Sequence, residues 1–131
     1  MIRLSLAATA ALALSACQPD EPSLQQIGYF KGENKNRVFV YQAPEGAKPE
    51  QVRILAAESM HTDKRMTAAF IFEAEAPNPI DNVTGATNFL AAMTAMFEQN
   101  TGWRWHYLHQ PSSDEWFYDC AVEQDDICPN R

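Results

Sequence analysis

The sequence predicts a small α+β domain with two layers, in which two helices pack on one face of a three- to four-stranded, mostly antiparallel sheet. The expected order is β-α-β-α-β-β. Segments 49–61 and 84–100 have helical apolar spacing, and they alternate along the chain with two strand-like segments, 37–42 and 66–74. Segment 103–122 is rich in aromatic residues and is interrupted by a short loop containing Pro and Ser, which predicts a hairpin.

The first strand and helix are separated by helix-breaking residues. Residues 37–42 (RVFVYQ) alternate valines with aromatic residues, a pattern typical of a strand. Pro44 and Gly46 end this segment. Pro49 suits a first helical turn, and the apolar residues that follow it recur at helical spacing, so a helix is expected over 49–61.

The second strand and helix follow the same logic. Residues 66–74 are apolar at consecutive positions around Ile71, as expected for a central strand covered on both faces. The next helix is expected to begin at Thr84 or Gly85 and to end at Asn100. We interpret its methionine and phenylalanine stripe as core rather than as a ligand groove. The stripe consists of Phe89, Met93, Met96 and Phe97.

The aromatic hairpin is the candidate binding feature. Alternation along a strand places every second residue on one face, and if the aromatic sets of the two strands coincide, the sheet carries a broad aromatic surface. Such a surface can stack on sugars or bind partner proteins, but the same rings can also fill the core of a small sheet, the interpretation we favour. The candidate surface residues are Trp103, Arg104, Trp105, Tyr107, His109, Trp116 and Tyr118.

The sequence offers no motif for catalysis, and we expect neither a cofactor nor a metal. His106 and His109 are three apart and therefore point to opposite faces of a strand, so they cannot chelate one ion without a bulge. No serine lies in a Gly-x-Ser-x-Gly turn. The carboxylates near His109 lie in or beside a loop, where solvation keeps them ordinary. A non-enzymatic protein is expected.

The beginning of the chain has the layout of an export signal. Arg3 is followed by an apolar or small run over 4–16, which is too short to span a membrane and has the size of a signal-peptide core. The run ends in Leu14-Ser15-Ala16-Cys17. This ending resembles the lipobox of bacterial lipoproteins, in which an aliphatic residue and two small residues precede the lipidated cysteine.

The resemblance implies that residues 1–16 are removed and that Cys17 carries a thioether lipid and an amide-linked acyl chain, expected to be palmitate. Two or three acyl chains anchor a protein stably, whereas one does not. The implied location is the cell envelope, facing the periplasm. Gln18 stands where Asp would resemble an inner-membrane retention signal, so the outer membrane is favoured over the inner. An ordinary secretory signal or a buried N-terminal helix is the alternative.

Cleavage would leave 115 of the 131 residues, enough for one domain. Residues 17–36 are rich in Pro, Gln, Asn and charge, and we interpret them as the lipidated N-terminus and a flexible tether. Residues 37–131 are expected to form the single globular domain. Without Arg3 the chain has nine basic and 17 acidic residues, a net charge of −8. This charge argues against nucleic-acid binding, and solubility is its simplest explanation.

Lipidation of Cys17 would leave two of the three cysteines, Cys120 and Cys128, with seven residues between them. A pair this close in an oxidising compartment predicts a disulfide that closes a short C-terminal loop. A redox or metal pair is the alternative, but no Cys-x-x-Cys motif is present and the intervening residues are acidic.

Two functions are compatible with these features. The first is a non-enzymatic envelope lipoprotein that serves as an accessory or protein-interaction subunit at a membrane surface. The alternative is a small-molecule or glycan-binding module that uses the aromatic hairpin 103–122. A hydrolase of the envelope is a more distant hypothesis, because no catalytic motif supports it.

Overall fold

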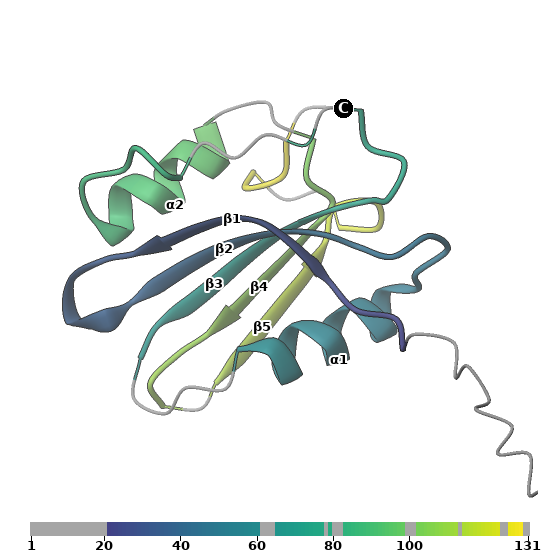
Figure 1. The fold of residues 1–131 in the computed structure, drawn as a ribbon, viewed down its shortest axis with the longest axis horizontal. Coiled ribbons are helices and arrows are strands. Elements are labelled where there is room, and N and C mark those ends of the chain that lie inside the picture. The colour runs from purple at the N-terminus through teal and green to yellow at the C-terminus, as the bar shows by residue number, and fades with distance from the viewer. Residues whose placement is uncertain are drawn as a thin grey trace, which may run out of the picture.

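The computed structural model describes residues 21–60, 65–77, 79, 83–98, 102–112, 114–123 and 126–129. The elements along the chain are β1 (Gln25–Lys31), η1 (Glu33–Lys35), β2 (Arg37–Gln42), α1 (Pro49–Ser59), β3 (Thr67–Phe72), α2 (Phe89–Glu98), β4 (Trp105–His109) and β5 (Glu115–Asp119). One sheet runs through the molecule between the two helices (Figure 1). The signal peptide and lipobox expected over residues 1–17 lie outside the described residues.

The sheet has five strands in the order β1-β2-β3-β4-β5, which is also their order in the chain. The strands β2 and β3 are parallel, joined by a crossover through α1, and the other three pairings are antiparallel. The α+β class and the mostly antiparallel sheet are therefore confirmed. The predicted number of three to four strands was too low, and the order is β-β-α-β-α-β-β.

The additional strand is β1, which lies inside the segment expected to be a tether, 17–36. It escaped detection because four of its seven residues are Gln, Gly or Lys and most of them are exposed, as expected for an edge strand with only one partner. A register shift between Gln26 and Gly28 also breaks its alternation. Ile27 and Phe30 pack against the core.

The helices lie on opposite faces of the sheet, so the two-layer prediction was wrong (Figure 1). Alternation along β2 is the physical reason: Val38 and Val40 belong to the apolar cluster that includes α2, whereas Phe39 and Tyr41 belong to the cluster that includes α1. Every residue of β3 is buried. Because both faces of the central strands are apolar, each face needs a covering layer.

The predicted helix over 49–61 is confirmed, with Pro49 in its first turn. The helix α2 begins later than expected, at Phe89, because its cap lies at Asn88. The Asn88 Oδ1 atom accepts a hydrogen bond from the Ala91 amide at 2.8 Å. The Phe89 amide donates to Glu33 Oε2 at 3.1 Å, so the turn between β1 and β2 holds the start of α2.

Within the described part of the chain, neither helix has the length and the apolar character needed to cross a membrane.

Candidate functional site

The predicted hairpin is formed by β4 and β5, but its aromatic residues do not gather on one face. The register pairs Tyr107 with Phe117 and Leu108 with Trp116. Paired residues share a face, so Trp105 and Tyr107 point toward α1, whereas Trp116 points to the α2 side. The two aromatic sets expected to coincide therefore lie on opposite faces of the hairpin.

Three of the candidate surface aromatics fill the core. Trp103, Trp105 and Tyr107 are exposed by 0%, 1% and 2%. Trp103 precedes β4 and joins the cluster on the α2 side, where its indole N–H donates to the Met96 carbonyl at 2.9 Å. Side chains alternate between the two faces only within a regular strand, and Trp103 lies before the start of β4, so the predicted alternation does not apply to it. These three rings cannot form the proposed stacking surface, and the core interpretation applies to them.

The outer face of the hairpin keeps an exposed tryptophan. The Trp116 side chain is 49% exposed, beside the partly buried Leu108 and Tyr118. We call Leu108, Trp116 and Tyr118 the Trp116 patch. The helix α2 packs over β1 and β2 and reaches β4 through the contact between Phe97 and His106. The patch therefore lies on the part of this face farthest along the sheet from β1 and β2.

Two acidic residues directly precede Trp116, and they lie differently. Asp114 is exposed. Glu115 belongs to the opposite face of the hairpin and joins it to α1: its Oε1 atom lies 2.7 Å from Arg53 Nη1, and its Oε2 atom accepts a hydrogen bond from the Tyr107 hydroxyl at 2.9 Å. Burial, followed by the hydrogen bond to Glu115, raises the pKa of Tyr107. This tyrosine is therefore held neutral as a structural donor.

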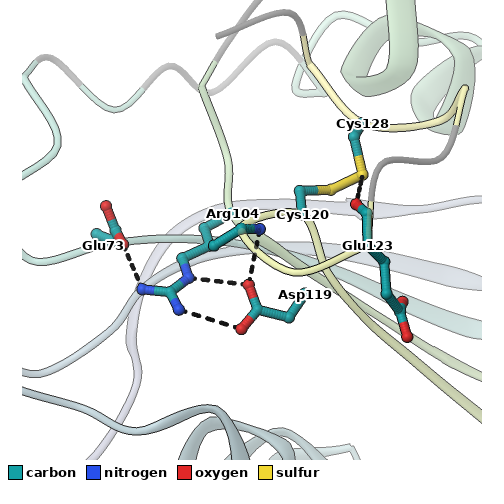
Figure 2. A network of polar contacts seen from close by, with 7 residues as sticks. Glu73, Arg104, Asp119, Cys120, Glu123 and Cys128 are labelled. Atoms are coloured by element: carbon teal, nitrogen blue, oxygen red, sulfur yellow. Dashed lines mark hydrogen bonds and ion pairs between the residues drawn. A yellow bond between two sulfur atoms is a disulfide. The ribbon is translucent and has the colours of Figure 1, made fainter.

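Arg104 lies at the centre of a polar network at the start of β4 (Figure 2). Its Nε and Nη2 atoms donate to Asp119 at 2.9 and 3.1 Å, and its Nη1 donates to Glu73 at 2.6 Å. The guanidinium also stacks on the Trp105 ring at 4.5 Å. Because the guanidinium makes two hydrogen bonds to one carboxylate, the orientations of Arg104 and Asp119 are both fixed.

Asp119 stays ionised within this network. Burial alone would raise its pKa, but the hydrogen bonds from Arg104 and from the Ala121 amide lower the pKa below its usual value. The Trp105 indole N–H lies near the same carboxylate and contributes to this lowering, although the pair lacks the geometry of an ordinary hydrogen bond.

The two histidines of β4 point to opposite faces, as predicted. His106 is stacked on Phe70 and its Nδ1 lies 3.0 Å from the Ala69 carbonyl, which requires a proton on Nδ1. Burial lowers the pKa of His106 to about 4, so the ring is neutral at pH 7. His109 belongs to the face of Tyr107. The described residues contain no group of three or more side chains placed to hold a metal ion.

The predicted disulfide between Cys120 and Cys128 is confirmed, with an S–S distance of 2.05 Å and Cα atoms 5.6 Å apart. The Cys120 amide donates to the Arg104 carbonyl at 2.9 Å, so the disulfide begins beside the Arg104 network. By loop-closure entropy it contributes about 2–3 kcal/mol to stability. It ties the segment after β5 to the end of the sheet.

A crevice lies beside this network, at the carboxyl ends of β2 and β3. Its volume is about 190 Å³. It is lined by Pro44, Gly46, Ala47, Lys48, Glu73, Ala74, Glu75, Arg104 and Trp105. The sequence interpretation missed the crevice, although it placed Arg104 and Trp105 among the candidate residues. The signal that could have revealed it is a turn with charged residues after each of β2 and β3, combined with the parallel pairing of these two strands.

No family model matches the chain, and neither the curated proteins nor the solved structures contain a significant match.

Proposed function

We propose that this chain is a lipid-anchored, non-enzymatic protein of the bacterial cell envelope that serves as an accessory subunit and binds a partner protein through the Trp116 patch. The observation that carries the proposal is the half-exposed Trp116 on a hairpin whose other tryptophan, Trp105, is buried. A large ring left in solvent costs hydrophobic free energy, and tryptophan is enriched among the residues that dominate binding energy at interfaces.

The envelope location is supported by two covalent features. Of the three cysteines, Cys120 and Cys128 form the disulfide, which leaves Cys17 for the lipid. Disulfides persist in the periplasm and are rare in the cytosol of mesophiles, so the C-terminal pair agrees with the export that the lipobox resemblance implies. The amino-terminal signal and the pair at the other end of the chain thus support the same compartment independently.

The anchor predicts a defined N-terminal chemistry. Mass spectrometry of the protein from its host should show a chain that begins at Cys17, without residues 1–16, and carries a diacylglycerol and an acyl chain. The matched Cys17→Ser variant should keep the precursor mass, because it lacks the thiol that is lipidated before cleavage. An unmodified Cys17 thiol in the exported protein, or wild-type protein in the soluble fraction, would refute the anchor.

The chemistry of the patch defines the partner. The aromatic surface of Trp116 needs an apolar pocket, and the exposed carboxylate of Asp114 favours Lys or Arg at the rim of that pocket. The net charge of −8 on the chain without residues 1–16 strengthens attraction to a basic partner and weakens binding to acidic proteins. We therefore propose an envelope protein with an apolar pocket surrounded by basic residues.

Photo-cross-linking in the host tests this interaction. With benzoylphenylalanine in place of Trp116, we expect a discrete adduct with one protein, and Asp114→Lys in the same chain should reduce its yield. With the partner identified, Trp116→Ala should weaken the complex about 30-fold, the cost of removing a hot-spot tryptophan.

Leu90 is the matched control position, since it is 72% exposed and lies on α2 rather than on the hairpin. Benzoylphenylalanine at Leu90 should not give the same adduct. The interaction proposal is wrong if position 116 gives no adduct, if Leu90 gives the same pattern, or if Asp114→Lys leaves the yield unchanged.

A further inference from the structure

The crevice occupies the position at which open sheets commonly bind ligands. The connection that leaves β2 leads to α1 on one face, and the connection that leaves β3 leads to the helix α2 on the other face. Connections that depart to opposite faces leave a gap beyond the carboxyl ends of β2 and β3. Open α/β sheets bind ligands beyond the carboxyl ends of their parallel strands, although the strand order here does not reverse as it does in those sheets. The crevice lies there, between residues 44–48 and residues 73–75.

Hydrogen bonds hold both walls of the crevice in place. In the wall that follows β2, the Ala47 amide donates to the Pro44 carbonyl at 3.2 Å. In the wall that follows β3, the Ala76 amide donates to the Glu73 carbonyl at 3.1 Å. The Gln42 side chain joins the two walls by donating to the Ala74 carbonyl at 3.1 Å. Two hydrogen-bonded turns, joined by a third hydrogen bond, give a preformed site, which reduces the entropy lost on binding.

On the side of the crevice next to β4, the guanidinium of Arg104 is held in a fixed position. Arg104 is only 21% exposed at its side chain and is held by Asp119, Glu73 and the Trp105 ring. The Nη1 and Nη2 atoms of Arg104 each carry two N–H groups. Each atom uses one of them, Nη1 in the hydrogen bond to Glu73 and Nη2 in the hydrogen bond to Asp119. The hydrogen bonds to Asp119 and Glu73 keep the pKa of Arg104 above its usual value, against the effect of burial.

The two walls carry opposite charges. The wall after β2 ends at the exposed Lys48, which directly precedes α1. The opposite wall presents the carboxylate of Glu75, beside Glu73, whose Oε1 atom already accepts a hydrogen bond from Arg104 at 2.6 Å. A ligand that spans the crevice therefore meets a positive end and a negative end.

We propose that the crevice binds a small zwitterion of amino-acid or dipeptide size, with its carboxylate toward Lys48 and its ammonium toward Glu75. A volume of about 190 Å³ holds roughly six waters at about 30 Å³ each, and it is smaller than pockets for drug-sized ligands. This site is separate from the Trp116 patch and does not depend on the lipid anchor.

Calorimetric titration of the full-length mature protein in detergent tests the proposal, with glycylglycine as the probe. We expect saturable binding of glycylglycine. Two analogues lack one charge each, N-acetylglycylglycine the ammonium and glycylglycinamide the carboxylate, and each should bind about tenfold more weakly, the usual effect of losing one charge-assisted hydrogen bond.

Variants of the exposed wall residues locate the binding site. Lys48→Gln should weaken glycylglycine about tenfold and should remove the preference over glycylglycinamide, while Glu75→Gln should remove the preference over N-acetylglycylglycine. Lys31→Gln is the matched control, because Lys31 is an exposed lysine paired with Arg37 at the other end of β2.

The proposal is overturned if glycylglycine shows no saturable binding at millimolar concentration, if the analogues bind as well as glycylglycine, or if Lys48→Gln and Lys31→Gln have the same effect. Because the cross-linking test concerns a different face, failure here leaves the result at Trp116 unaffected.

Discussion

Replacing Trp103 by alanine should lower the free energy of unfolding by about 3–5 kcal/mol, which is a large part of the stability of a domain of this size. Trp103 is fully buried, with its ring centroid 5.2 Å from that of Phe70 and 6.2 Å from that of Phe97. The substitution leaves a cavity in the cluster beneath α2. It also removes the indole donor from the Met96 carbonyl.

Denaturant unfolding followed by far-UV circular dichroism measures this effect. Trp116→Ala is the control, because its half-exposed ring contributes less to the folded state, and it should cost about 1 kcal/mol or less. Equal losses for the two variants would contradict the assignment of Trp103 to the core and of Trp116 to the surface. If Trp103→Ala does not fold, Trp103→Phe should fold with a smaller loss of stability than alanine would cause.

Acidification should remove about 3 kcal/mol of stability through His106 alone. The pKa of this ring is about 4 in the folded protein, lowered by burial, and about 6.5 in the unfolded chain. Between these values the unfolded state binds a proton that the folded state excludes, so stability falls as the pH falls. The contribution is fully present above about pH 6.5 and is lost by about pH 4.

The denaturation midpoint, measured from pH 7 to pH 4.5, should fall steeply in the wild type and much less in His106→Phe. The phenylalanine ring cannot be protonated, so the slope with pH reports the titration even if the variant is less stable at every pH. A slope unchanged by His106→Phe would rule out the buried neutral ring. Asp119, whose pKa is lowered, contributes its own loss only at more acidic pH.

Local patterns in the sequence predicted the individual elements well. The strand over 37–42 and the start of the helix at Pro49 agree with β2 and α1, because alternation and a proline in the first turn are local signals. The hairpin was predicted from aromatic strand-like segments around a Pro and Ser loop, and the Cys120–Cys128 pair from its close spacing and the expected oxidising compartment; both are confirmed. These features depend on residues close together in the chain, which explains why a single sequence reveals them.

The features that failed depend on pairing and packing between elements, which the pattern within one segment does not show. The strand β1 is recognisable only through its pairing with β2, since its residues carry no clear apolar pattern. The faces of the helices depend on the parallel pairing of β2 with β3, which brings residues such as Val40 and Phe70 together. The two-layer prediction assumed that one face of the sheet stays polar, and the fully buried β3 shows that it does not.

In the candidate site too, the residue types were predictable from the sequence, whereas their packing was not. The residue types were identified, but their environments were not: Trp105 and Tyr107 were assigned to a surface and lie in the core, while Trp116 stays exposed. Arg104 was included as a partner of aromatic stacking, and in the structure it holds Asp119 and Glu73. The crevice could not be foreseen because it joins residues 44–48 to Glu73 and Glu75 across a parallel pairing.

The agreement between strand order and chain order also bears on how the molecule folds. Each strand pairs with the strand that precedes it in the chain, so no strand has to wait for a partner that is synthesised or released later. The pairings of β1 with β2 and of β4 with β5 have short sequence separations, which reduce the entropy of loop closure, whereas the pairings of β3 with β2 and with β4 close longer loops. A chain that emerges amino end first can therefore extend its sheet one strand at a time, and β5 completes it.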